Sequence, residues 1–266
     1  MMEAPLSRFT AVIPLYNKAK TINRAIRSVL GQTGVDVHLV IVDDGSTDGS
    51  VAAIDKALLP SIELVREVNA GPGRARNAGA ARAKGEFIAF LDADDEWEPG
   101  YLAAAAAALD AHPECAAYVA AYTAGAAQHI QKNVLLDLIP ETGPRAPDGF
   151  STPADIKAYV DCFHSSSTVV RTASFRRYGG FFDRERSLYG EDSYLWLQIA
   201  FGERVYFDRT SLVHFHVEDS ALGAKQRGRH PRRPALIFPE PLYENCPPTR
   251  RPSRCSSPPS TPWGRS

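Results

Sequence analysis

The sequence predicts an α/β protein with an open, mostly parallel sheet and helices on both faces. Short apolar runs alternate with segments of helical periodicity through residues 9–113. The runs at 39–42 and 88–91 are apolar at every position, which is typical of parallel strands covered on both faces. The connections between runs are long enough for the right-handed crossovers that join parallel neighbours.

Four strands and four helices are expected to alternate in the first half of the chain. The strands are expected at 9–14, 35–44, 62–68 and 86–95. The helices are expected at 18–32, 50–59, 71–85 and 100–113. The first helix shows apolar residues at helical spacing before Gly31, and the last is stopped by Pro113.

The pattern loosens after residue 115. We expect a strand at 116–125, a Pro- and Gly-rich loop at 140–155 and a strand, short helix and glycine turn over 165–183. A helix at 190–202 and one or two strands over 204–220 follow.

The chain divides into a folded domain, 1–226, and a tail, 227–266. Ten of the 20 prolines and eight arginines fall in this tail, a composition that cannot bury enough apolar surface to fold alone. We therefore expect a disordered tail, either as an extension or as a frameshifted reading of a longer gene.

Composition indicates a soluble globular protein without nucleic-acid affinity. The chain is 44% hydrophobic and 23% charged, with a net charge of -1, so no global attraction to polyanions is expected. The four cysteines are widely spaced and form no CxxC pair, which argues against a zinc site or a disulfide framework. With no signal peptide or long apolar run, the expected location is cytoplasmic, at most peripheral to the inner face of a membrane.

Two of the predicted parallel strands end in carboxylates. Asp43 and Asp44 close the second strand, and Asp92, Asp94 and Asp95 close the fourth. Ligands of such sheets bind outside the carboxyl ends of the strands. Crowded carboxylates raise one another's pKa unless a positive group lies between them, so either water on an open turn or a cation surrounds Asp92, Asp94 and Asp95.

Five segments in order resemble the family-2 glycosyltransferases, which are inverting enzymes with the GT-A fold. They read AVIPLYN, VIVDDGSTDGS, ARNAGAARAKGEFIAFLDADD, GGFFD and GEDSYLWLQIA, and the resemblance covers roughly residues 9–220. It implies transfer of a sugar from a nucleotide-diphospho donor, preferably UDP-linked, with Mn²⁺ or Mg²⁺ as cofactor. The implied acceptor is a hydroxyl of a saccharide or lipid-linked molecule in cell-surface polysaccharide synthesis.

The resemblance also implies roles for residues at the strand ends. Asp44 corresponds to the aspartate that contacts the uracil ring, while Asp43 is structural or faces the ribose. Pro14 and Tyr16, at the end of the first strand, are placed along the nucleotide. Arg76 is either a solvated helix residue or a contact to phosphate or base, where a guanidinium binds well.

The resemblance also implies which residues bind the metal and which residue acts as the base. Asp94 is the implied direct ligand, and Asp92 touches ribose, the metal or a metal-bound water. His216 is a candidate extra ligand, although the family's Arg-then-His pattern is replaced here by His216 and Glu218. Asp192 is the implied general base with Glu191 as the alternative, although acidic residues also favour a helix's first turn for electrostatic reasons.

Two alternatives remain. A nucleotidyltransferase would share the parallel sheet, the acidic ligands and the nucleotide, but such enzymes carry a glycine-rich basic loop where this chain has PLYNKAKT. A non-catalytic or truncated nucleotide-sugar-binding module is the other alternative, because the tail is unlike the family's C-terminal helices.

Overall fold

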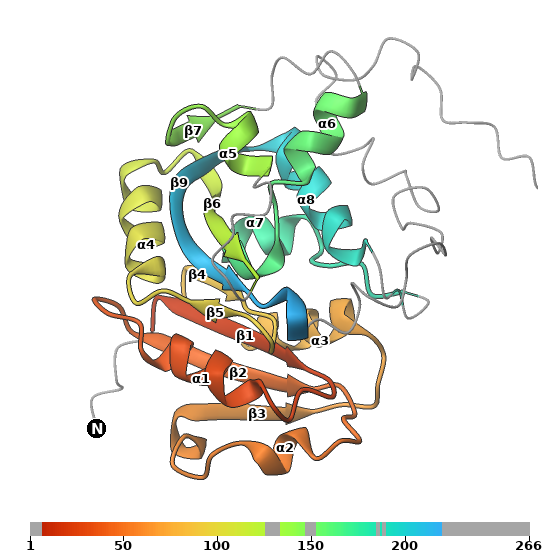
Figure 1. The fold of residues 1–266 in the computed structure, drawn as a ribbon. Coiled ribbons are helices and arrows are strands. Elements are labelled where there is room, and N and C mark those ends of the chain that lie inside the picture. The colour runs from red at the N-terminus through yellow and green to blue at the C-terminus, as the bar shows by residue number, and fades with distance from the viewer. Residues whose placement is uncertain (1–6, 126–133, 147–152, 185–186, 188–189, 220–266) are drawn as a thin grey trace, which may run out of the picture.

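A computed structural model describes residues 7–125, 134–146, 153–184, 187 and 190–219 of the chain. These residues form one curved sheet with the strand order β3-β2-β1-β4-β8-β6-β9-β5, to which β7 adds beside β9. Helices cover both faces of the sheet (Figure 1). The predicted tail, 227–266, lies outside the described residues.

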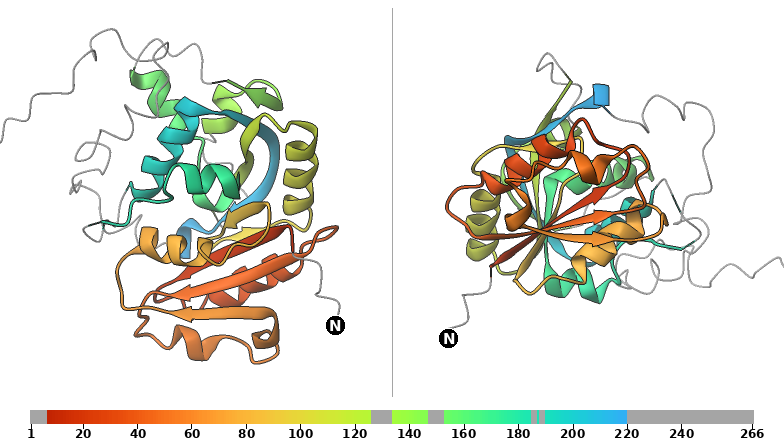
Figure 2. Two further views of the ribbon diagram at one scale, coloured as in Figure 1. Left: turned by 180° about the vertical axis from the view of Figure 1, so that it is seen from behind. Right: turned by 90° about the horizontal axis from the view of Figure 1, so that it is seen from below.

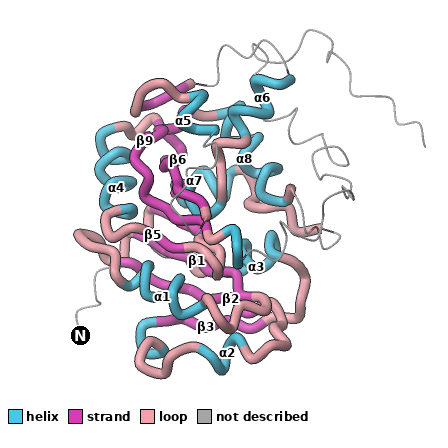
Figure 3. The backbone as a smooth tube through the Cα atoms, viewed as in Figure 1, coloured by secondary structure: helices cyan, strands magenta, loops and turns pink. Residues whose placement is uncertain are grey.

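The first half of the sheet is parallel, as predicted. Its strands are β1 (Phe9–Leu15), β2 (Val37–Asp43), β3 (Ile62–Arg66) and β4 (Phe87–Phe90). β1 lies in the middle and pairs with both β2 and β4, while β3 pairs with β2. Because all four run the same way, their carboxyl ends reach the same edge (Figure 1). Figure 3 traces the helices and loops that join them.

The crossover helices are α1 (Ile22–Leu30), α2 (Ser50–Ala53), α3 (Pro72–Ala80) and α4 (Tyr101–Ala111). Helix α2 is shorter than the predicted 50–59, and a 3₁₀ turn, η1 (Leu59–Ser61), follows it. Pro60 within that turn has no N–H for a longer helix to use.

Two apolar clusters fill the space between sheet and helices. Residues of α1 and α4 pack on one face, and residues of α3, α7 and α8 pack on the other. Figure 2 shows the arrangement of the helices around the sheet in two further views. Gly79 lets α3 press directly on β1, because a Cβ at this position would lie 2.3 Å from Val12 Cγ1.

The second half of the sheet is mixed. β8 (Thr168–Arg171) inserts between β4 and β6 (Cys115–Ala124) and runs antiparallel to both. β9 (Arg204–Phe215) runs parallel to β6 with register shifts along the pair, and it is one strand where one or two were expected. Two short strands, β5 (Glu96–Trp97) and β7 (Gly143–Arg145), pair with β9.

The remaining helices connect these strands. They are α5 (Val134–Leu138), α6 (Pro153–Val160), α7 (Thr172–Arg177) and α8 (Glu191–Gly202), with the 3₁₀ turns η2 (Ser165–Ser167) and η3 (Val217–Asp219). Strands β5 and β7 and helix α5 were not predicted, and α6 begins inside the loop expected at 140–155. No helix in the described part of the chain is both long and apolar enough to cross a bilayer.

Candidate active site

A pocket of about 250 Å³ lies beside the carboxyl end of β4. It brings together four of the predicted site residues, Asp92, Asp94, Asp192 and His216. They come from three separate places: the strand end, the start of α8 and the end of β9. The rest of the lining is Asp95, His164, Ser165, Ser166, Phe215 and Val217.

Each carboxylate at the end of β4 has its own partner in the protein. Asp92 Oδ1 lies 2.6 Å from Arg76 Nη2, and Asp94 Oδ2 lies 2.5 Å from Lys18 Nζ. Asp95 Oδ2 accepts a hydrogen bond of 2.6 Å from the Ser166 hydroxyl. The chain itself therefore supplies two cations and one hydroxyl to the carboxylates of this strand end.

These partners do not relieve the crowding completely. Burial, followed by the charge of Asp92, raises the pKa of Asp94, even though the hydrogen bond from Lys18 lowers it. Burial and then Asp92 also raise the pKa of Asp95 well above its ordinary value. Carboxylate oxygens and an imidazole nitrogen are donors that Mn²⁺ accepts, and the lining contains both, so its chemistry fits a divalent cation.

Arg76 joins the end of β4 to the start of α8. Its side chain is 6% exposed, and besides Asp92 it contacts Glu191, with Nη1 2.9 Å from Glu191 Oε1. The interpretation of Arg76 as a solvated helix residue is therefore wrong, because two carboxylates hold its guanidinium in the interior. A contact from Arg76 to the nucleotide stays a prediction.

Glycine allows the close packing around this link. A Cβ at Gly73 would lie 2.2 Å from the carbonyl oxygen of Phe182 and 3.1 Å from Glu191 Cγ. Helix α3 can approach the segment before α8 only because this position has no side chain.

Glu191 and Asp192, although adjacent, have different surroundings. Glu191 is buried against Arg76, and burial together with the charge of Asp192 raises its pKa to about 7. Asp192 lines the pocket, and its Oδ1 accepts the backbone N–H of Ser193 at 2.6 Å. Of the two, Asp192 is the carboxylate that reaches the pocket.

His216 lies where β9 ends. Its Nδ1 is 3.2 Å from Glu218 Oε1, and its Nε2 is 3.4 Å from Glu96 Oε2. His216, Glu218 and Asp219 each place a ligand atom within 4.8 Å of the others. His214 packs beside His216 with ring centroids 4.3 Å apart, as expected for residues that face the same side of a strand.

Asp43, Asp44, Pro14 and Tyr16 lie at the ends of β1 and β2, outside the lining of this pocket. Asp44 is 4% exposed, and its two oxygens accept the N–H groups of Ala70 and Gly71 at 2.7 and 3.0 Å. Asp43 Oδ1 accepts the N–H of Ser46 at 3.0 Å. Pro14 pairs with Val42 in the sheet, while Tyr16 is 45% exposed.

Sequence reasoning missed several residues around the pocket. Lys18 and Arg24 contact the strand end from the segment after β1, and Ser166 holds Asp95 from the turn before β8. His164 packs edge-on against Tyr122 and Phe215, and burial lowers its pKa. No sequence motif marks these residues, because each comes close to the site only when distant segments of the chain fold together.

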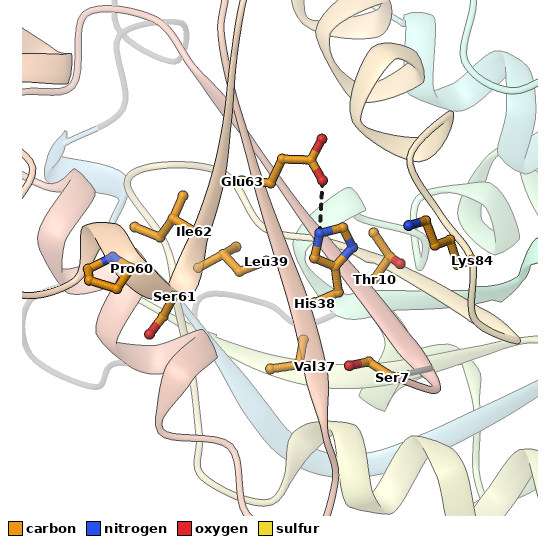
Figure 4. A pocket seen from close by; sticks show the side chains of 10 residues that line it. All are labelled: Ser7, Thr10, Val37, His38, Leu39, Pro60, Ser61, Ile62, Glu63 and Lys84. Carbon is orange, nitrogen blue, oxygen red and sulfur yellow. Dashed lines mark ion pairs between the residues drawn. The ribbon is translucent and has the colours of Figure 1, made fainter. Parts of the chain in front are cut away.

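A larger pocket of about 450 Å³ lies at the opposite edge of the sheet, at the amino ends of β1, β2 and β3. Its polar lining includes Ser7, Thr10 and Lys84, and His38 Nε2 lies 3.0 Å from Glu63 Oε2 (Figure 4). None of the predicted site residues lines it. Ligands of open α/β sheets bind at the carboxyl ends of the strands, so the smaller pocket is the candidate active site.

The sequence profile of glycosyl transferase family 2 matches residues 10–179, which is more than half of the chain. The chain belongs to glycosyl transferase family 2. The match begins in β1 and ends after α7, so it includes both acidic strand ends.

Curated relatives match over a shorter region. The succinoglycan biosynthesis protein ExoO of Rhizobium meliloti is 47% identical over 94 residues, covering 35% of this chain and 27% of ExoO. An uncharacterized glycosyltransferase of Nostoc, alr2836, is 46% identical over 95 residues, which are 35% of this chain and 30% of that protein. The matched region thus spans less than a third of the length of either relative.

Solved structures share the fold over most of the chain. S. aureus TarS 1-349 in complex with UDP has a TM-score of 0.65 at 24% identity, covering 80% of this chain and 62% of that chain. The mannosyltransferase PcManGT of Pyrobaculum calidifontis, in complex with GDP-Man and Mn²⁺, has a TM-score of 0.60 at 19% identity. It covers 91% of this chain and 70% of that chain. These similarities confirm the predicted GT-A type of fold.

Proposed function

We propose that this protein is an inverting, metal-dependent glycosyltransferase that moves a sugar from a nucleotide-diphospho donor to an acceptor hydroxyl. The observation that carries the proposal is the meeting of Asp92, Asp94, Asp192 and His216 in one pocket. A cation-binding strand end and a separate carboxylate are the two parts that this chemistry needs.

The base is Asp192. An acceptor hydroxyl must lose its proton as the new glycosidic bond forms, and a positioned carboxylate accepts it. Asp192 faces the pocket, whereas Glu191 is held by Arg76 in the interior. Glu191 therefore acts on the site only indirectly, by binding Arg76 and fixing the position of α8. In the proposed reaction the deprotonated hydroxyl attacks the anomeric carbon with inversion.

The cation site is formed by Asp94, with Asp92 and His216 beside it. A divalent cation held there would supply positive charge where negative charge builds on the departing diphosphate. The carboxylates would hold it at the end of β4, where Lys18 now pairs with Asp94 and Arg76 with Asp92.

The donor is a nucleoside-diphosphate sugar, with uridine as the preferred nucleoside. TarS binds UDP and UDP-GlcNAc, and PcManGT binds GDP-Man. A carboxylate offers about four lone-pair sites, so Asp44 keeps acceptor capacity for uracil after bonding Ala70 and Gly71. We place the nucleotide along Pro14, Tyr16 and Asp43, and the ExoO relative favours an acceptor in polysaccharide synthesis.

A thermal-shift panel of nucleotides tests the donor site. At a UDP concentration of about 100 times the dissociation constant, binding should stabilise the protein by about 2.7 kcal/mol in Mn²⁺, and much less in EDTA. Asp94→Asn should lose the metal-dependent part of the shift, while Glu63→Gln at the amino edge should keep it. Equal shifts with and without metal would exclude a metal-bridged donor, and donor binding without sugar transfer would favour the non-catalytic alternative.

A further inference from the structure

The ammonium of Lys18 forms an ion pair with the carboxylate of Asp94, which is the best candidate metal ligand. Lys18 Nζ lies 2.5 Å from Asp94 Oδ2, and the two side chains are 16% and 13% exposed. The same ammonium donates a hydrogen bond of 2.7 Å to the backbone carbonyl of Asp219. Lys18 therefore bridges the end of β4 and the segment that follows β9.

Arg24 reaches the same two segments through different atoms. Its Nη2 donates to the backbone carbonyl of Asp94 at 2.5 Å and to Asp219 Oδ2 at 2.8 Å. Arg24 thus adds positive charge near Asp94 without contacting the Asp94 carboxylate. Of the two cations, Lys18 is the one that competes for a ligand oxygen.

We propose that Lys18 is a resident counter-cation of Asp94 that a divalent ion must displace, so that Lys18 sets the metal affinity of the site. The inference rests on the proposed function in taking this pocket as a divalent-cation site. An ion that takes Asp94 Oδ2 as a ligand would share that oxygen with the ammonium, which lies 2.5 Å from it. Two cations at one carboxylate oxygen repel strongly.

The side chain of Lys18 suits an exchange of this kind. Its ammonium is a compact charge on a flexible four-carbon stem, and a rotation of that stem moves the charge several ångströms. A displaced ammonium stays beside the pocket, because its backbone is fixed by the hydrogen bond of 2.7 Å from Lys18 N to the Ser50 hydroxyl. There it can pair with the phosphate oxygens of a donor.

Mn²⁺ binding to the full chain without donor tests the inference. We would compare the wild type with Lys18→Met by calorimetry and by the electron paramagnetic resonance signal of free Mn²⁺. Removing the competing ammonium should tighten Mn²⁺ binding roughly tenfold, an effect of about 1.4 kcal/mol. Lys18→Arg keeps a cation at this place and should stay within about threefold of the wild type.

Two further variants separate competition from a general loss of charge. Lys84→Met removes one positive charge at the amino edge and should leave the Mn²⁺ affinity unchanged. In an Asp94→Asn background, Lys18→Met should no longer matter, since the contested carboxylate is gone. Circular dichroism would check folding, and Lys18→Gln would replace Lys18→Met if the latter failed to fold.

The outcomes are distinct from those of the donor experiment. Mn²⁺ binding by Lys18→Met that is no tighter than in the wild type would overturn the inference, as would a wild type and variant that both bind no Mn²⁺. Tighter Mn²⁺ binding in a protein that binds no nucleotide sugar would support the inference while rejecting the proposed function. Sugar transfer by the wild type, together with a Mn²⁺ affinity that Lys18→Met leaves unchanged, would support the proposed function and overturn the inference.

Discussion

One pocket lies at the amino ends of β1, β2 and β3 and the other beside the carboxyl end of β4, but the charges at these two edges are paired in different ways. At the amino edge, Glu63 contacts His38 and Arg82, and all three side chains are at least 32% exposed. At the carboxyl edge, Arg76 and Glu191 are 6% and 8% exposed. Water can solvate the first group of charges, whereas the protein must compensate the second.

This difference matters more than cavity size in deciding where the chemistry lies. The amino-edge pocket is the larger of the two, yet its exposed pairs are of a kind worth about 0–1 kcal/mol. Buried charges are retained at a cost, and perturbed pKa values cluster at functional sites. The carboxyl edge has both buried charges and perturbed pKa values.

Removing the proposed base should give the largest contrast between the edges. Asp192→Asn should lower the rate of sugar transfer by about 10²–10⁴, because the acceptor hydroxyl loses its proton acceptor. Glu63→Gln, a matched carboxylate-to-amide change at the amino edge, should leave the rate unchanged. A radiolabelled-donor transfer assay with UDP binding measured in parallel would show this. Wild-type transfer by Asp192→Asn together with loss in Glu191→Gln would reverse the two roles.

Breaking one ion pair at each edge should separate the edges by stability. Arg76→Met leaves Asp92 and the buried Glu191 without their cation, which should cost about 3–5 kcal/mol of unfolding free energy. Arg82→Met removes an arginine that is 50% exposed, and should cost no more than about 1 kcal/mol. Urea unfolding of both variants measures the difference. Similar costs for the two would mean that the carboxyl-edge charges are no more dependent on pairing than surface charges.

The pH dependence of stability should reveal the burial of Glu191, with a smaller effect. Its pKa is raised to about 7 by burial and by Asp192, so the folded state binds a proton more tightly than the unfolded chain. Proton binding by Glu191 therefore stabilises the folded state. This stabilisation is fully present below about pH 4.3, the ordinary pKa of a glutamate, and is lost as the pH rises to about 7.

Relative to Glu191→Gln, the wild type should therefore lose on the order of 1–3 kcal/mol of unfolding free energy across this window. Urea unfolding of both proteins at several pH values between about 4 and 8 measures it. A difference that stays constant with pH would show that Glu191 has the same proton affinity in both states.

The parallel half of the fold could be predicted because its signals are local. Apolar runs such as 39–42 and 88–91, with a helix between successive strands, determine both the element type and the parallel pairing. β5 has only two residues and β7 only three, which is too short for any periodicity. The insertion of β8 between β4 and β6 depends on contacts between distant segments, which no local pattern contains.

The site was predictable only where a motif marks it. Asp92, Asp94 and Asp192 come from segments that resemble the family, whereas the family's pattern is replaced at His216. The structure places all four in one pocket. Nothing in PLYNKAKT distinguishes Lys18 from Lys20, because the partner of Lys18 is 76 positions away. Trp196 is fully buried beside Phe163 and Phe181, so it fills the core.

The path of β9 has a consequence for the order in which the protein folds. β9 pairs with β6, β5 and β7, and the segment after it meets Lys18 and Arg24 across 201 and 195 positions of sequence. Contacts between residues so far apart in the sequence form late, since a long loop must close before they contribute to stability. During synthesis, the parallel strands can assemble while β9 is still in the ribosome, with the edge of β6 unpaired and liable to join other chains. The acidic pocket is therefore among the last parts of the molecule to form, and it reports whether the whole described fold is complete.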